Sequence, residues 1–80
     1  MLRRRFGPTD IELPVIGQGS WMLEGDDRAA VTAAIHRGID LGMRHIDTAE
    51  MYGSGRVEEL LRDVLEGRRD EVYLVSKVLP

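Results

Sequence analysis

Two stretches of the chain repeat apolar residues with the period of an α-helix. The first is predicted as a helix over 27–41, because apolar or small side chains recur at intervals of three and four residues. These positions are Val31, Ala34, Ile35, Gly38 and Ile39. Asp26 and Asp27 favour the beginning of the helix, since acidic side chains accept hydrogen bonds from its free backbone amides and interact favourably with its dipole. Gly42 favours its end.

The second stretch predicts a helix over 57–66. Its apolar positions are Val57, Leu60, Leu61, Val64 and Leu65. Glu58 and Glu59 lie in its first turn, where negative charge is favourable. Ser54 and Gly55 are both suitable N-terminal caps, and the sequence does not distinguish between them.

Three apolar segments alternate with these helices and are predicted as β-strands. They cover residues 15–19, 44–48 and 72–78. The third is almost entirely apolar, as expected for a strand of a parallel sheet that is buried on both faces. The order strand, helix, strand, helix, strand with short connections predicts an α/β fold with right-handed crossovers.

The N-terminal residues are predicted as a β-hairpin. Residues 2–6 and 11–13 flank the segment 7–10, which is rich in turn-forming residues. The arginines at 3–5 then lie on an exposed strand edge, where charge discourages pairing with other chains. A binding patch is the less favoured interpretation of these arginines.

The composition is that of a globular protein, and it argues against several classes of partner. The 80 residues are 42% hydrophobic and 31% charged, which differs from a disordered chain. A formal net charge of −3 and scattered basic residues argue against nucleic acid. No apolar run reaches the roughly 20 residues of a membrane span, and no apolar stretch follows the basic N-terminus as in a signal peptide. Since the chain has no cysteine, we expect a cytoplasmic protein.

Three side chains of complementary chemistry follow the predicted strands. Asp47 lies at the end of the second strand, Tyr52 in the loop behind it, and Lys77 at the end of the third, so all three converge on one rim. An ammonium near a phenol lowers the phenol pKa from about 10, and a carboxylate keeps the ammonium charged and oriented. Such a triad is a proton donor for a carbonyl oxygen.

Each of these residues alone has a simpler interpretation. An aspartate at a strand end often caps a turn, a loop tyrosine often buries its ring near the surface, and a lysine near a strand end usually extends into water. Their combined spacing favours the catalytic interpretation.

The sequence resembles the aldo/keto reductase family along nearly its whole length. Residues 17–21 are similar to the first-strand signature of that family, 45–53 to its second and 75–78 to its third. The resemblance implies a (β/α)₈ barrel, a fold that typically needs about 250 residues. This chain would supply the N-terminal hairpin, over 1–14, and the first three strands and two helices of the barrel, over 15–80.

The resemblance also implies an NADPH-dependent reductase of aldehydes or ketones. It assigns Tyr52 as the general acid, Lys77 as the partner that adjusts its pKa, and Asp47 as the residue that orients the lysine. The positions that it implies for cofactor binding are Gly19, Ser20, Trp21 and Asp47. Trp21 has two equally suited interpretations: its family counterpart lines the substrate pocket, and an aromatic residue here could instead cap the core.

Other motifs in the chain are weaker signals. Residues 17–19 lack the third glycine and the following helix of a dinucleotide fingerprint, and 53–55 lack the lysine of a phosphate loop.

His45 has the strand parity of Asp47, so we predict that both side chains point to the same side of the strand. We interpret His45 as a core histidine whose ring nitrogens have hydrogen-bond partners. An electrostatic role towards Asp47 is the alternative. His36 is predicted at the surface, and no spacing suggests a metal site.

The fourth catalytic residue of the family, a histidine on the next strand, has no counterpart among these 80 residues. We therefore expect the 80 residues alone to be inactive and to self-associate through exposed strand edges. The rival interpretation is a truncated or non-catalytic relative that acts as a binding or regulatory module. A reading frame that continues past Pro80 to such a histidine would favour the enzyme, whereas a stop codon would favour the module.

Overall fold

The first hydrophobic repeat folds as helix α1 (Arg28–Asp40) in the computed structural model, which describes residues 1–80. Of the two aspartates that favour its beginning, Asp27 is the N-cap, because its carboxylate accepts a hydrogen bond from the backbone amide of Ala30 at 3.0 Å. Gly42 follows the helix with a φ of 97°, a conformation that glycine adopts without strain. Local sequence signals therefore set both ends of α1.

The second repeat folds as helix α2 (Arg56–Val64). Its N-cap is Gly55 and not Ser54, because the chain enters the helix with a φ of 95° at this position. A short 3₁₀ helix, η2 (Tyr52–Gly55), leads directly into α2. None of the helices is long and apolar enough to cross a membrane.

The strands form two separate sheets. One is the hairpin of β1 (Arg3–Arg5) and β2 (Glu12–Pro14), which pair antiparallel. The other is parallel, in the order β3-β4-β5, and its strands are β3 (Gln18–Gly19), β4 (His45–Asp47) and β5 (Tyr73–Val75). The predicted alternation of strands and helices is therefore confirmed.

The parallel strands are shorter than predicted, most of all at the two edges of the sheet. Of the predicted strand 15–19 only its last two residues pair, and Val15 and Ile16 are 48% and 54% exposed. The predicted strand 72–78 ends at Val75, so Lys77 lies two residues beyond β5. The reason is that β3 and β5 each have a neighbouring strand on one side only. The central strand β4 is shorter than its predicted range, 44–48, by only one residue at each end.

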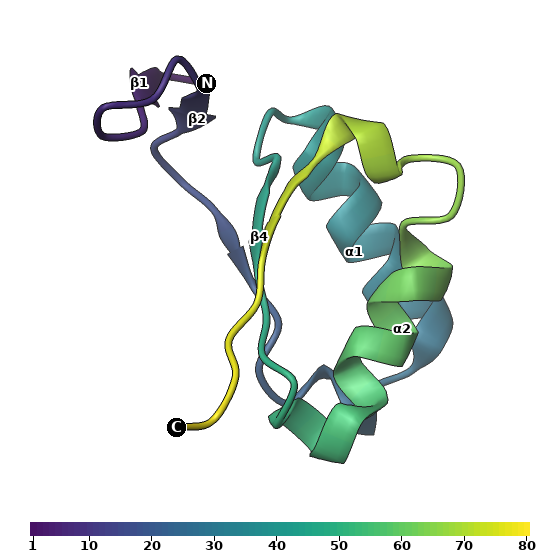
Figure 1. Cartoon of the computed structure of the whole chain (residues 1–80). Helices are drawn as coiled ribbons and strands as arrows, with labels where there is room; N and C mark the ends of the chain where they lie inside the picture. The colour runs from purple at the N-terminus through teal and green to yellow at the C-terminus, as the bar shows by residue number, and fades with distance from the viewer.

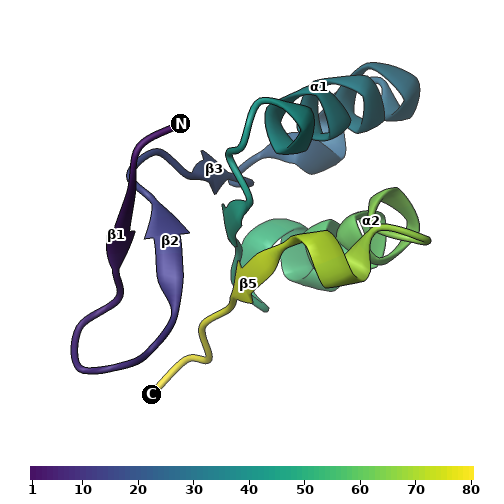
Figure 2. The same ribbon diagram turned by 90° about the horizontal axis from the view of Figure 1, so that it is seen from above.

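Helices α1 and α2 lie next to each other on one face of the parallel sheet (Figure 2). The core between these layers contains Val31, Ile35, Ile39, Ile46, Val57, Leu60, Leu61, Val64, Leu65 and Val72. Ile46, from the central strand, is 1% exposed. The apolar positions of α2 are all buried, but Ala34 of α1 is exposed, because no further element covers the edge beside β3.

The side chain of Gln18 ties β3 to α1. Its amide nitrogen donates to the backbone oxygens of Ile35 at 3.3 Å and Met43 at 3.0 Å. A Cβ atom on Gly38 would lie 2.5 Å from this amide. The glycine in the apolar repeat of α1 therefore provides the space for a polar contact between strand and helix.

The hairpin projects from the parallel sheet on the side away from the helices (Figure 1). The ring of Phe6, which lies in the hairpin, packs edge to face against Tyr73 of β5, with ring centroids 5.7 Å apart. The arginines at 3–5 are exposed. They lie on a solvated strand edge, as predicted.

The prediction that His36 is a surface residue is wrong, because its side chain is half-buried between the helices. Its Nε2 atom donates to the backbone oxygen of Val64 at 2.7 Å. Arg68 adds a second connection here, with ion pairs to Asp40 at 2.7 Å and Glu71 at 2.8 Å. The ends of α1 and α2 meet at this point, so free carbonyl groups of α2 need donors from α1.

Candidate functional site

Asp47, the last residue of β4, forms an ion pair with Lys77, which lies two residues beyond β5. The Lys77 Nζ atom donates to Asp47 Oδ1 at 2.5 Å and to the backbone oxygen of Thr48 at 2.7 Å. The Asp47 and Lys77 side chains are 53% and 47% exposed, so solvent and ligands can reach both. Lys77 is the only lysine in the 80 residues.

Tyr52 completes the group of side chains that the sequence predicted together. The Lys77 Nζ atom lies 5.2 Å from the centroid of the Tyr52 ring. Tyr52 is half-buried, and its ring packs against the core with Leu23 and Leu74. The core therefore holds the ring, while the carboxylate of Asp47 places the ammonium beside it.

The electrostatics of the ion pair keep Lys77 protonated. The hydrogen bond from Lys77 to the Asp47 carboxylate raises the pKa of Lys77 above its usual value of 10.5. Partial desolvation opposes this shift, and the hydroxyl of Tyr52 adds to it. The site therefore presents a fixed positive charge beside a phenol throughout the neutral pH range.

Backbone contacts hold the end of β4 in place on both sides. The Ser20 hydroxyl donates to the backbone oxygen of Asp47 at 2.8 Å, and the Ser20 amide donates to the same oxygen at 3.1 Å. On the other side, the Thr48 amide donates to the backbone oxygen of Val75 at 2.8 Å. Ser20 is 1% exposed, so its hydroxyl supports the position of Asp47.

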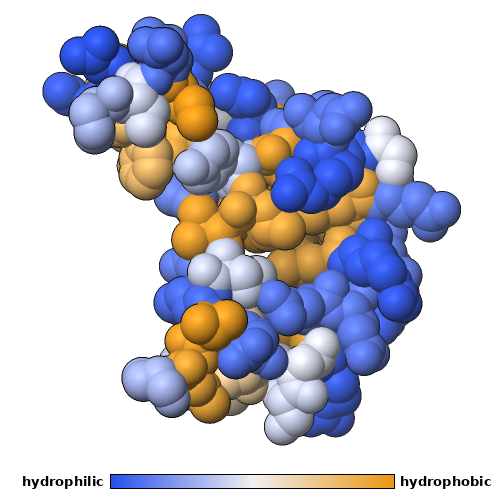
Figure 3. Space-filling model, in the orientation of Figure 1, coloured by the Kyte–Doolittle hydropathy of each residue, from blue (hydrophilic) through white to orange (hydrophobic).

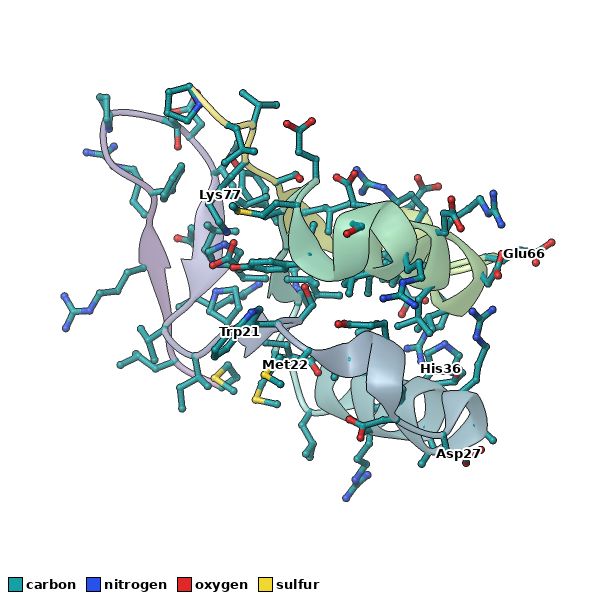
Figure 4. All side chains as sticks on the ribbon, turned by 90° about the horizontal axis from the view of Figure 1, so that it is seen from below. Trp21, Met22, Asp27, His36, Glu66 and Lys77 are labelled. Carbon is teal, nitrogen blue, oxygen red and sulfur yellow. The ribbon has the colours of Figure 1, made fainter.

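Trp21 lies at the open rim of the site and is 71% exposed. The interpretation that it caps the core is therefore wrong. The following residue, Met22, has a φ of 69°, so the chain turns sharply at the end of the edge strand β3 and leaves the indole uncovered. A Cβ atom on Gly19 would meet no atom within 4 Å, so the backbone here is open as well. Figure 4 shows Trp21, Met22 and Lys77 on the side of the sheet opposite the helices.

His45 points to the same face of the sheet as Asp47, as predicted. Its ring packs edge to face against Tyr73, with centroids 5.8 Å apart. Gly17 passes close to this residue, and a Cβ atom there would lie 2.9 Å from the His45 backbone oxygen. His45 is half-buried and lies two residues before Asp47 on β4. No three potential ligand side chains cluster as a metal site.

Sequence reasoning missed Glu24, which lies in the 3₁₀ helix η1 (Leu23–Gly25). Its side chain packs against Gly53, the residue after Tyr52, so a Cβ atom on Gly53 would lie 2.9 Å from Glu24 Cδ. No spacing in the sequence links positions 24 and 53. The one available signal is the pair of glycines after Tyr52, which indicates an unusual backbone conformation.

Comparisons with known proteins agree on one family. The model of the aldo/keto reductase family matches residues 15–80. The methylglyoxal reductase YeaE of Escherichia coli is 47% identical over 73 residues, which cover 89% of this chain and 26% of that protein. The pyridoxal 4-dehydrogenase of Microbacterium luteolum is 35% identical over 80 residues, which cover 95% of this chain and 23% of that protein. The chain thus spans about a quarter of the length of these curated relatives.

Solved structures give the same result. An aldo-keto reductase from Klebsiella pneumoniae in complex with NADPH matches with a TM-score of 0.79 and 45% identity, over 84% of this chain and 24% of that one. The holo form of an aldo-keto reductase from Bacillus halodurans matches with a TM-score of 0.87 and 31% identity, over 98% of this chain and 26% of that one.

Proposed function

Because this chain belongs to the aldo/keto reductase family, we propose that it forms the N-terminal part of a reductase that uses NADPH to convert an aldehyde or ketone to an alcohol. Its parallel sheet and two outer helices correspond to part of the (β/α)₈ barrel of that family. Active sites of such barrels lie at the carboxyl ends of the strands, which is where Asp47 and Lys77 meet.

The residues at this rim fit a nicotinamide nucleotide. The half-exposed carboxylate of Asp47 is a suitable acceptor for a ribose hydroxyl. The exposed indole of Trp21 offers an aromatic surface next to the uncovered backbone of Gly19. Ser20 would act by holding Asp47 in position. The cofactor supplies the hydride when it is bound.

In this proposal the chain itself supplies the proton. Tyr52 donates it from the hydroxyl to the carbonyl oxygen of the substrate, which gains negative charge as its carbon is reduced. The charged Lys77 favours release of that proton, since a nearby cation stabilises the phenolate. Asp47 keeps the ammonium charged and directed towards the site. The convergence of these three side chains at one strand end is the observation that carries the proposal.

The substrate class follows from the same site and from one relative. The matched E. coli protein is named for methylglyoxal, a small 2-oxoaldehyde, so this compound is the first substrate to test. Specificity beyond a carbonyl group depends on the rest of the pocket, to which Trp21 would contribute one wall.

The experiment that tests this function is Tyr52→Phe in the complete protein that carries this chain. We expect reduction of methylglyoxal to fall by at least about hundredfold, the usual contribution of a general acid, whereas NADPH binding stays within about twofold. Tyr73→Phe is the matched control, because the Tyr73 ring packs below the site against His45. Normal turnover by Tyr52→Phe would exclude Tyr52 as the proton donor.

A further inference from the structure

One carboxylate oxygen of Glu24 is buried against the loop that carries Tyr52. This atom, Oε2, is inaccessible to solvent and has no hydrogen-bond partner. A Cβ atom on Gly53 would lie 2.9 Å from Glu24 Cδ, 3.0 Å from its Cγ and 3.1 Å from Oε2. Burial of a carboxylate oxygen without a hydrogen-bond donor is unfavourable. Other interactions of Glu24 must therefore offset this unfavourable free energy.

The loop that Glu24 contacts has a left-handed backbone, and one of its residues, Ser54, is strained. The φ angles of Gly53, Ser54 and Gly55 are 57°, 55° and 95°, three consecutive residues in a conformation that L side chains rarely adopt. Gly53 and Gly55 adopt it without strain, whereas Ser54 carries a side chain and is strained. Such strain persists only where surrounding contacts hold the backbone, and it is concentrated at functional sites.

The contact between Glu24 and Gly53 joins the segment that follows Trp21 to the loop that follows Tyr52. Glu24 lies three residues after the exposed Trp21, and its neighbour Leu23 packs against the core, as Tyr52 does. The helix η1 packs against α2, and Glu24 contacts Gly53, three residues before α2 begins without a side-chain cap. A carboxylate near a helix N-terminus is electrostatically favourable, and this offsets part of the unfavourable burial.

We propose that Glu24 is a positioning residue for Tyr52: its side chain fills the space over Gly53 and holds the strained loop, so that the Tyr52 hydroxyl stays directed towards Lys77. The inference rests on the proposed function, since it assigns Glu24 to the placement of the proton donor. Glu24 itself does not touch the reacting atoms.

Two substitutions of Glu24 in the complete protein test this role. In Glu24→Ala we expect kcat to fall by at least about tenfold with KM changed by less than about twofold, because misplacement of a catalytic group affects the chemical step. Amide hydrogen exchange over residues 53–57 of the cofactor-free protein should become about tenfold faster, with α1 unchanged. Glu24→Gln keeps the contact with Gly53, so it should restore both measurements to within about threefold of the wild type.

A substitution from the other side of the contact adds a coupling test. Gly53→Ala brings a methyl group against Glu24, so its effect on kcat should be at least about fivefold smaller in the Glu24→Ala background. Gly7→Ala is the matched control, because Gly7 has the same φ of 57° and no atom within 4 Å. Gly7→Ala should change kcat equally little in both backgrounds.

Three outcomes would overturn the inference. They are unchanged exchange over 53–57 in Glu24→Ala, faster exchange there with normal kcat, and equal effects of Gly53→Ala in both backgrounds. Failure of the proposed function is distinguishable from these. A wild-type protein that reduces no carbonyl compound would refute the reductase, while the exchange measurement would still decide whether Glu24 holds the loop.

Discussion

At the scale of single residues, the ion pair between Asp47 and Lys77 sets the chemistry of the site and adds little to stability. Both side chains are about half exposed, and exposed ion pairs contribute little to folding. The pair instead places a permanent cation beside Tyr52. Because Lys77 has two acceptors, Asp47 Oδ1 and the backbone oxygen of Thr48, its ammonium has a defined position.

The first prediction concerns the titration of Lys77. In Asp47→Asn we expect the pKa of Lys77 to fall towards 10.5, because the carboxylate is the main cause of its raised value. The stabilisation by this pair is therefore present below pH 10.5 and is lost as the pH rises through the higher pKa of the folded protein. NMR of the Lys77 side chain, assigned with Lys77→Met, measures the shift. Glu50→Gln removes a carboxylate that bonds Leu79 instead and should leave the titration unchanged.

The second prediction ranks the substitutions by their effect on turnover. Lys77→Met should lower kcat by about hundredfold or more and change the alkaline limb of the pH–rate profile, because it removes the charge beside the proton donor. Asp47→Asn should lower kcat less, since the ammonium remains. Arg37→Met, which removes an exposed cation from α1, is the control and should retain wild-type turnover. A greater loss of kcat in Asp47→Asn than in Lys77→Met would show that Asp47 does more for the chemical step than orient Lys77.

At the scale of elements, polar side chains connect strands to helices and helix to helix. Apolar packing alone does not fix how far one such element is shifted along another, and these polar contacts do. Gln18 joins the edge strand β3 to α1 through two backbone oxygens. His36 and Arg68 join the C-terminal ends of the two helices. These contacts orient the helices relative to the strand ends, where Ser20 bonds the backbone oxygen of Asp47.

The third prediction tests the contact between β3 and α1. Gly38→Ala improves helix propensity by about 1 kcal/mol, but its Cβ atom would displace the Gln18 amide from two hydrogen bonds worth about 1 kcal/mol each. We therefore expect net destabilisation of about 1 kcal/mol in urea unfolding of the complete protein. In the Gln18→Ala background the same substitution should be stabilising. Equal effects in the two backgrounds would show that Gln18 does not determine the need for glycine.

At the scale of the whole molecule, the chain leaves both edges of its parallel sheet open. Its accessible surface is 5527 Å², compared with about 4,900 Å² for a compact protein of this mass. Beside β5, a groove of about 780 Å³ is lined in part by Leu61, Leu65 and Leu74. Figure 3 shows an apolar area exposed in the middle of this face, between polar rims. Such edges favour association with further strands.

The fourth prediction concerns residues 1–80 expressed alone. We expect a self-associating species that unfolds without a sharp transition, does not reduce aldehydes and does not bind NADPH tightly, because only 16 of its 80 residues are buried. Sedimentation, denaturant unfolding and the fluorescence of Trp21 measure these properties, with the complete protein as the control. A two-state monomer that binds NADPH at low micromolar concentration would contradict this prediction.

The sequence by itself determined the order of the elements, the buried face of α2, most of that of α1, and the aspartate pair at which α1 begins. These features depend on contacts within a few residues, which periodicity and capping express directly. The motifs around Asp47, Tyr52 and Lys77 also predicted that these residues lie together, because the ends of neighbouring parallel strands meet at one rim.

Only the tertiary structure decided the features that depend on distant segments. It showed that β3 and β5 are short edge strands, that His36 bonds the end of α2, and that Trp21 is exposed. It also brought Glu24 against Gly53, positions that are 29 residues apart. Such contacts form only when the chain folds back on itself. Their energies depend on which backbone groups remain unpaired and which space remains unfilled, and no local pattern contains that information.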